Sequence, residues 1–261
     1  MKKNTGIVSN GLLTLSLLAT LVPASLMSYF PFNEKAYQYM DQQALESNTD
    51  KSSRHHNYTK VYSQWFDSIK NKPIKFLEIG VFRGESVKLW EKYFSKADLH
   101  FIDINYNLLT YLPTRATLHT ADQGDPNQLI ALMQKTGGNF DVILDDGGHT
   151  MHQQKTSFAT LFPYVKSGGL YIIEDLHTSY WSGPDGNWFI NLNGLNDVHN
   201  DHQSAVELLK HLIDHVNYVG ARTGKADHDK NMDAIRAELN IYREQILSMT
   251  FYDSVCIIVK R

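Results

Sequence analysis

The sequence FLEIGVFRGES, residues 76–86, begins as a short apolar run that a glycine ends. Such a run is typical of a buried strand. The residues that follow, ESVKLWEKYF (85–94), have the apolar spacing of an amphipathic helix. Glycine at positions 80 and 84 allows a tight turn and a close approach of the backbone to a ligand. The stretch therefore predicts a strand, a turn and a helix.

The same alternation continues along the chain. Apolar runs predict further strands at 98–104, 116–120, 140–146 and 168–175. Helical spacing predicts helices at 125–136, 152–165, 204–216 and 234–245. Residues 246–261 predict two strands that turn at Asp253-Ser254. Because strands that alternate with helices form parallel sheets, we predict an α/β fold, a Rossmann-like doubly wound, mostly parallel seven-stranded sheet with an antiparallel C-terminal hairpin.

Three regions are predicted in the domain organisation. Residues 1–30 are apolar after Lys2 and Lys3, which is typical of a signal peptide, a short anchor or a packed helix. Residues 31–70 form a helical extension, whose Tyr58-to-Phe66 aromatic face is a candidate homo-oligomer interface. Residues 71–261 form the main domain, interrupted by a lid near 178–200 that is rich in Gly, Asn and Trp.

Composition excludes some classes of protein. The chain has 261 residues and a net charge of -3, so no basic surface favours nucleic acid. Its single cysteine, Cys256, lies in an apolar run and excludes an internal disulfide.

Residues around the first turn suggest a nucleoside cofactor. Glu78, Gly80 and Gly84 surround the turn, but Phe82 stands where a dinucleotide fingerprint has its third glycine, which disfavours a nicotinamide dehydrogenase. Asp103 ends the next strand, where a carboxylate can accept bonds from ribose hydroxyls. Asp122 and Gln123, after the third strand, are candidates to contact an adenine edge. An acid in such a loop favours a cationic ligand such as S-adenosylmethionine.

Acidic residues also follow the fourth and fifth strands. Asp146, Glu174 and Asp175 lie where neighbouring parallel strands end, and such a set of carboxylates favours a hard divalent cation such as Mg²⁺. His149 follows Asp146 by three residues and is a candidate general base. The alternative is that these acids cap the following helices. Asp145 is expected to hold the site residues in place without binding the ligand itself. His152 and His177 are expected to lie at the surface or to contact site residues in the same indirect way.

These motifs resemble class I S-adenosylmethionine-dependent methyltransferases, in particular the magnesium-dependent sugar O-methyltransferases of macrolide biosynthesis, of the macrocin and mycinamicin type. The resemblance runs from about Thr49 to the end and is most specific over 141–181. It implies that Asp146, Glu174 and Asp175 bind magnesium, that His149 is the general base, and that the glycine turn and Asp103 hold the cofactor. The family usually has serine where this chain has Gly148.

The resemblance implies O-methylation of a vicinal hydroxyl on a sugar or glycosylated natural product. Three alternatives stay open: a catechol or other diol acceptor, a cephalosporin-tailoring type of reaction, and a methyltransferase-like subunit without catalysis. Because S-adenosylmethionine is made in the cytoplasm, we expect a cytoplasmic enzyme. Residues 11–30 are a candidate membrane-association segment, and export is the competing expectation.

Overall fold

The computed structural model describes residues 32–180, 204–221, 242 and 245–261. The predicted apolar segment 1–30, residues 181–200 of the predicted lid, and most of the predicted helix 234–245 lie outside the described residues. No helix within the described ranges has both the length and the apolar character needed to cross a membrane.

All of the elements described below belong to one compact unit, Asn33–Arg261. They are α1 (Glu34–Ser47), α2 (Thr59–Phe66), β1 (Lys75–Ile79), α3 (Glu85–Tyr93), β2 (Asp98–Asp103), β3 (Thr117–Thr120), α4 (Pro126–Thr136), β4 (Phe140–Asp145), α5 (Met151–Leu161), η2 (Phe162–Tyr164), β5 (Val165–Ile173), η3 (Leu176–Tyr180), α6 (Ala205–Ala221), β6 (Ile246–Tyr252) and β7 (Val255–Lys260).

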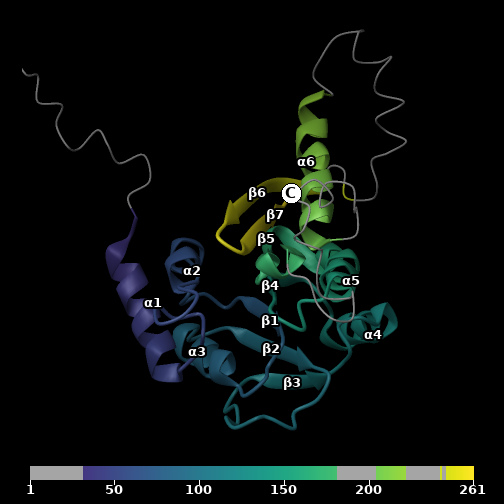
Figure 1. The fold of residues 1–261 in the computed structure, drawn as a ribbon. Coiled ribbons are helices and arrows are strands. Elements are labelled where there is room, and N and C mark those ends of the chain that lie inside the picture. The colour runs from purple at the N-terminus through teal and green to yellow at the C-terminus, as the bar shows by residue number, and fades with distance from the viewer. Residues whose placement is uncertain (1–31, 181–203, 222–241, 243–244) are drawn as a thin grey trace, which may run out of the picture. The chain divides into compact units, whose positions relative to one another are not determined.

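The strands form a seven-stranded sheet in the order β3-β2-β1-β4-β5-β7-β6 (Figure 1). Strands β1 to β5 are parallel where they pair, whereas β7 runs antiparallel to β5 and β6 antiparallel to β7. The predicted doubly wound sheet with its C-terminal hairpin is therefore confirmed. Strand order reverses between β1 and β4, and ligands of such sheets bind beyond the carboxyl ends of the strands at this point.

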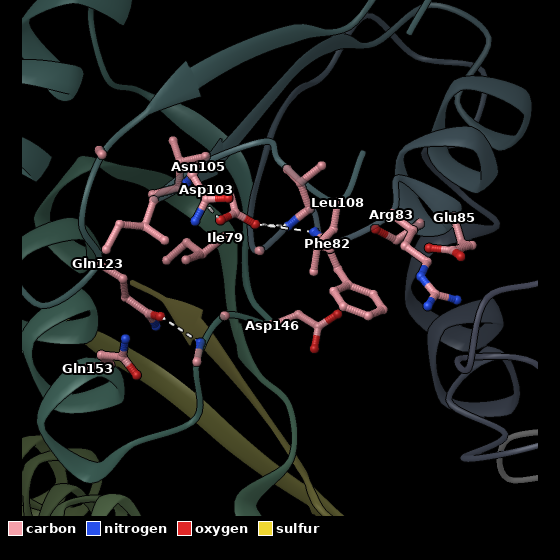
Figure 2. Close-up of a pocket in the computed structure, with 18 of the residues that line it drawn as sticks. Ile79, Phe82, Arg83, Glu85, Asp103, Asn105, Leu108, Gln123, Asp146 and Gln153 are labelled. Carbon is pink, nitrogen blue, oxygen red and sulfur yellow. Dashed lines mark hydrogen bonds between the residues drawn. The ribbon is translucent and has the colours of Figure 1, made fainter. Parts of the chain in front are cut away.

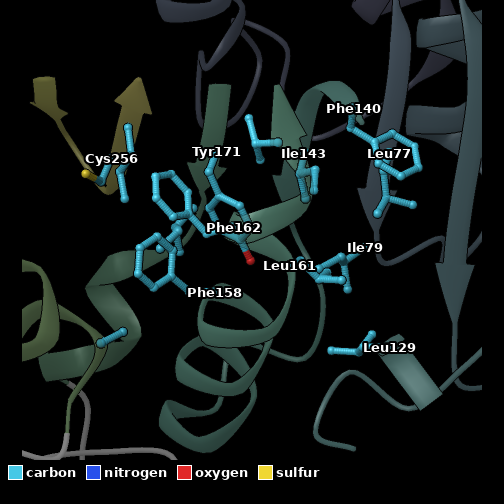
Figure 3. Packing of buried hydrophobic residues seen from close by; sticks show 14 of the residues in the cluster. Leu77, Ile79, Leu129, Phe140, Ile143, Phe158, Leu161, Phe162, Tyr171 and Cys256 are labelled. Atoms are coloured by element: carbon cyan, nitrogen blue, oxygen red, sulfur yellow. The ribbon is translucent and has the colours of Figure 1, made fainter. Parts of the chain in front are cut away.

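Each face of the sheet carries its own hydrophobic core because alternate side chains of a strand point to opposite faces. From β1, Leu77 and Ile79 enter the core that contains Leu129 of α4 and Phe158 of α5 (Figure 3). Phe76 enters the opposite core, with side chains of α1, α2 and α3. Both faces of β1 are thus covered, which explains its continuous apolar run.

The helical extension predicted at 31–70 consists of two helices joined by a loop at residues 48–58. Tyr62 and Phe66 of α2 are fully buried, and their rings lie 5.9 and 5.7 Å from that of Trp90 in α3. Large aromatic side chains contribute much of the apolar area that a fold buries. Asp41 of α1 accepts hydrogen bonds from Ser53 N at 2.7 Å and from Thr59 Oγ1 at 2.7 Å, which ties the 48–58 loop to both helices.

Candidate active site

The predicted site residues meet at one edge of the sheet. Three backbone hydrogen bonds align the strand ends there: Gly80 N to Ile102 O (2.8 Å), Asp146 N to Ile79 O (3.0 Å) and Glu174 N to Asp145 O (3.0 Å). The residues that follow β1, β4 and β5 are consequently neighbours, although about 95 positions separate the first from the last in sequence. This arrangement is what the strand pattern predicted.

A cavity of about 470 Å³ lies at this edge. Of the six predicted cofactor residues, Gly80, Asp103, Asp122 and Gln123 line it, whereas Glu78 and Gly84 do not. Figure 2 shows Asp103, Gln123 and Asp146 approaching it from three different strand ends. The charged side chains that line the cavity are those of Asp50, Glu85, Asp103, Asp122, Asp146 and Arg83. Carboxylates outnumber the single guanidinium, so the cavity favours a ligand with positive charge.

The turn after β1 is held from both sides. Asp103 Oδ2 accepts hydrogen bonds from the backbone N–H groups of Val81 (2.9 Å) and Phe82 (3.2 Å) (Figure 2). Gly80 has a φ of +96°, and a Cβ at that position would lie 2.0 Å from the carbonyl oxygen of Asp146. Glycine is therefore required where the β1 turn and the β4 turn touch.

Glu78 does not line the cavity and is fully buried. Its carboxylate accepts a hydrogen bond from Ser86 Oγ at 2.9 Å, and one of its oxygens lies 3.6 Å from the ammonium nitrogen of Lys51. Burial raises the pKa of Glu78 to about 8, against the lowering effect of Lys51. A contact between Glu78 and a cofactor stays a prediction.

Gln123 and Asp145 support the loop that carries His149. Gln123 Nε2 donates to Asp145 Oδ1 at 2.5 Å, and Gln123 Oε1 accepts from Gly148 N at 3.0 Å. Asp145 is fully buried, also accepts from Ser157 Oγ, and its burial raises its pKa to about 6. The supporting position expected for Asp145 is therefore present. The predicted contact of Gln123 with an adenine edge stays a prediction, since both ends of its amide are engaged here.

Asp146, His149 and Asp175 form a candidate divalent-cation group. One ligand atom from each lies within 4.8 Å of the other two. His149 Nε2 lies 3.3 Å from Asp175 Oδ2 and 3.8 Å from Asp146 Oδ1. Although burial raises the pKa of Asp175, His149 and the hydroxyl of Tyr58 lower it below its usual value. A carboxylate that stays ionised is a ligand that Mg²⁺ prefers.

Capping does not explain Asp146. Thr150 is the N-cap of α5, and with Gln153 it forms a capping box in which each side chain satisfies a backbone N–H group of the other. The alternative in which Asp146 caps this helix is therefore wrong. His152 is exposed and contacts the carbonyl of Gly124, in agreement with the expected surface position.

The third predicted metal ligand, Glu174, lies in a different environment. It is 1% exposed, Tyr62 donates to its Oε1, and Lys51 Nζ donates to its Oε2 at 2.7 Å. Burial and the charge of Asp146 raise its pKa well above the usual range. Both of its oxygens therefore have partners from the 51–62 segment, and its role as a ligand stays a prediction.

Three residues of this segment complete the site and were not identified from the sequence. Lys51 Nζ forms ion pairs with Glu78, Asp146 and Glu174. Tyr58 donates to Asp175 Oδ1 at 2.6 Å, and Tyr62, one helical turn later, donates to Glu174. The four-residue spacing of the two tyrosines predicts that they share one helical face, but no sequence pattern links that face to the Glu-Asp pair 112 and 117 residues away.

Several curated O-methyltransferases are similar to this chain. The L-olivosyl-oleandolide 3-O-methyltransferase of Streptomyces antibioticus is 31% identical over 197 residues, which are 73% of this chain and 49% of that protein. The demethylmacrocin O-methyltransferase of Streptomyces fradiae is 32% identical over 170 residues, 62% of this chain and 40% of that protein. The mycinamicin VI 2''-O-methyltransferase of Micromonospora griseorubida is 32% identical over 173 residues, again 62% and 40%. The chain thus spans less than half the length of these curated relatives. No family model matches it.

Solved structures of a methyltransferase from the mycinamycin pathway are also similar to this chain. The MycE methyltransferase from the mycinamycin biosynthetic pathway, in complex with Mg, SAH and Mycinamycin VI, matches with a TM-score of 0.66 and 26% identity, over 85% of this chain and 54% of that one. A second MycE structure, with Mg and SAH, has a TM-score of 0.69 at the same identity and covers 85% and 53%. The resemblance predicted from the sequence is thereby confirmed: over 62–73% of its length the chain is a homologue of the macrolide sugar O-methyltransferases.

Proposed function

We propose that the chain is an S-adenosylmethionine-dependent, magnesium-dependent O-methyltransferase that acts on a vicinal hydroxyl of a sugar or glycosylated natural product. The observation that carries the proposal is the position of Asp146, which lines the cavity and also belongs to the candidate cation group. A methyl donor in the cavity and a cation on that group would both adjoin the same carboxylate. The name of the Streptomyces antibioticus relative specifies an olivosyl compound, which favours a sugar acceptor.

The residues fit both proposed partners. A cavity of about 470 Å³ falls within the range of roughly 300–1,000 Å³ that is common for small-molecule sites. Its excess of carboxylates suits a ligand that carries an ammonium and a sulfonium. The carboxylates of Asp146 and Asp175 are hard oxygen ligands of the kind that Mg²⁺ binds.

Bound S-adenosylmethionine would supply a sulfonium methyl group, and a bound divalent cation would supply a positive charge beside the acceptor hydroxyl. His149 would receive the proton that the hydroxyl loses as the new carbon–oxygen bond forms. Its Nε2 faces Asp175 Oδ2 at 3.3 Å, so that carboxylate can stabilise the imidazolium that results. His149 has a left-handed backbone, with a φ of +55°, and its Nε2 lies beside the carboxylates of Asp146 and Asp175.

The test begins with calorimetric titration of the full chain with S-adenosylmethionine in the presence of Mg²⁺. We expect micromolar binding, and no response to a nicotinamide dinucleotide. Incubation with a panel of acceptors should then transfer a methyl group to a glycosylated macrolide. Transfer only to catechol would favour the alternative acceptor, and cofactor binding without any transfer would favour a non-catalytic subunit. A folded sample that does not bind S-adenosylmethionine would contradict the proposal.

Replacing Asp146 with Asn should weaken Mg²⁺ binding by about 100-fold or more, because the loss of an outer-sphere partner alone typically costs about 10–100-fold. Calorimetric titration with Mg²⁺ measures the effect. Asp125→Asn is the matched control, since Asp125 caps α4 through Asn127 N and asparagine is an equally good N-cap. Equal affinities for Mg²⁺ in the two variants would exclude Asp146 as a ligand.

A further inference from the structure

Lys51 places an ammonium group in the centre of the acidic cluster. Its side chain is 1% exposed, and its Nζ lies within ion-pair distance of Glu78, Asp146 and Glu174. These acids belong to β1 and to the residues after β4 and β5. Within the described ranges, Lys51 is the only lysine or arginine that forms an ion pair with any of them. A buried charge is retained only where partners compensate its desolvation.

The contacts of Lys51 overlap with the proposed metal ligands. Two of the three carboxylates in the predicted ligand set, Asp146 and Glu174, accept hydrogen bonds from Lys51 in this structure. The group that is arranged to bind a cation, Asp146, His149 and Asp175, includes the histidine in place of Glu174. Asp146 is common to both sets, with Oδ2 toward Lys51 and Oδ1 toward His149.

Two cations that share one carboxylate repel each other strongly where water is excluded. We propose that Lys51 is a built-in counter-cation, which neutralises Asp146 and Glu174 when no divalent cation is bound and withdraws from them when one binds. The inference rests on the divalent-cation site of the proposed function. A divalent cation must then compete with Lys51 for Asp146 and Glu174. The protein therefore binds the cation less tightly than these carboxylates would without Lys51.

The competition also determines what His149 does. While Lys51 holds Glu174, the protein groups arranged to meet a cation are Asp146, Asp175 and the imidazole of His149. Once Lys51 has withdrawn, Glu174 can complete the set with Asp146 and Asp175, and the imidazole nitrogen is free to accept a proton. Lys51 is thus a positioning residue, since it acts through Glu174 and not on the acceptor.

The test compares Mn²⁺ binding by the wild-type chain and by Lys51→Met, with electron paramagnetic resonance of aqueous Mn²⁺ as the readout. Removing a unit charge from a buried site next to the cation should tighten Mn²⁺ binding by about tenfold or more. Without a divalent cation the variant should melt at a lower temperature than the wild type, because three carboxylates lose the ammonium group of Lys51. Saturating Mg²⁺ should raise its melting temperature more than it raises that of the wild type.

Lys166→Met is the matched control. It removes the same charge from the opposite edge of the sheet, where Lys166 pairs with Asp141 near the amino ends of β5 and β4, and it should leave Mn²⁺ affinity unchanged. If folded Lys51→Met binds Mn²⁺ no more tightly than the wild type, the inference is wrong. If neither protein binds Mn²⁺, the cation site of the proposed function fails and this inference fails with it.

A measurement on the wild type covers the case in which Lys51→Met does not fold. Nitrogen-15 NMR of lysine side chains detects buried ammonium groups, and the Lys51 signal should shift as Mg²⁺ saturates the protein. A Lys51 signal that stays unchanged while Mg²⁺ binds would overturn the inference.

Discussion

Replacing His149 with Asn should lower kcat for methyl transfer by about 10²–10⁴-fold, the usual contribution of a general base. Asparagine is the suitable replacement because His149 has a φ of +55°, a conformation that asparagine tolerates better than most residues. The β4–α5 loop should therefore keep its shape. Initial rates with a saturating acceptor measure the loss, and calorimetry should show an affinity for S-adenosylmethionine close to that of the wild type.

His152→Asn is the control for this experiment, because His152 lies three residues further along and is exposed. It should keep nearly all of the activity. A loss of less than about tenfold in His149→Asn would exclude the residue as the general base. A loss of cofactor affinity as large as the loss of rate would instead show that His149 shapes the cofactor cavity.

Replacing Gly80 with Ala should destabilise the fold by about 4 kcal/mol or more, a cost that only a few mechanisms produce. The new Cβ would lie 2.0 Å from the carbonyl oxygen of Asp146, and that oxygen belongs to backbone that cannot rotate away. The φ of +96° adds strain of its own. Because Gly80 lines the cavity and Asp146 belongs to the cation group, we also expect the binding of S-adenosylmethionine and of Mg²⁺ to be lost.

Urea unfolding followed by circular dichroism measures the change in stability. Gly168→Ala separates the cost of the steric clash from the cost of the positive φ. Gly168 has a φ of +76°, but a Cβ there would meet nothing within 4 Å. It should cost only the conformational part, about 1–2 kcal/mol. Equal costs at both positions would mean that the contact between Gly80 and Asp146 contributes nothing.

The fold could be predicted from the sequence because its signals are local. Continuous apolar runs such as those of β4 and β5 indicate strands buried on both faces, and the intervening helices have their own spacing and caps. The acids of the site could be predicted for the same reason. Asp103, Asp146 and Glu174 each directly end or follow a strand, and parallel strands bring their carboxyl ends to one edge.

The partners of those acids could not be predicted in this way. Lys51 lies 95 residues before Asp146, and Tyr62 lies 112 residues before Glu174. Their contacts depend on how α2 packs against α3 and on the path of the 48–58 loop, and no periodicity in the sequence encodes either. Because Lys51 is distant in sequence, the sequence pattern alone favoured a divalent cation beside these carboxylates and did not include an ammonium group.

The hydrogen bonds from the 51–62 segment to Asp146, Glu174 and Asp175 determine how this protein can be recombined with its relatives. The ammonium of Lys51 and the phenols of Tyr58 and Tyr62 satisfy carboxylates more than 90 positions away. A chimaera joined at residue 70, just before the first strand, would combine donors from one parent with acceptors from another. A segment exchanged between relatives keeps these hydrogen bonds only if it includes Lys51 together with the acids. Crossover points for directed evolution should therefore lie upstream of Lys51.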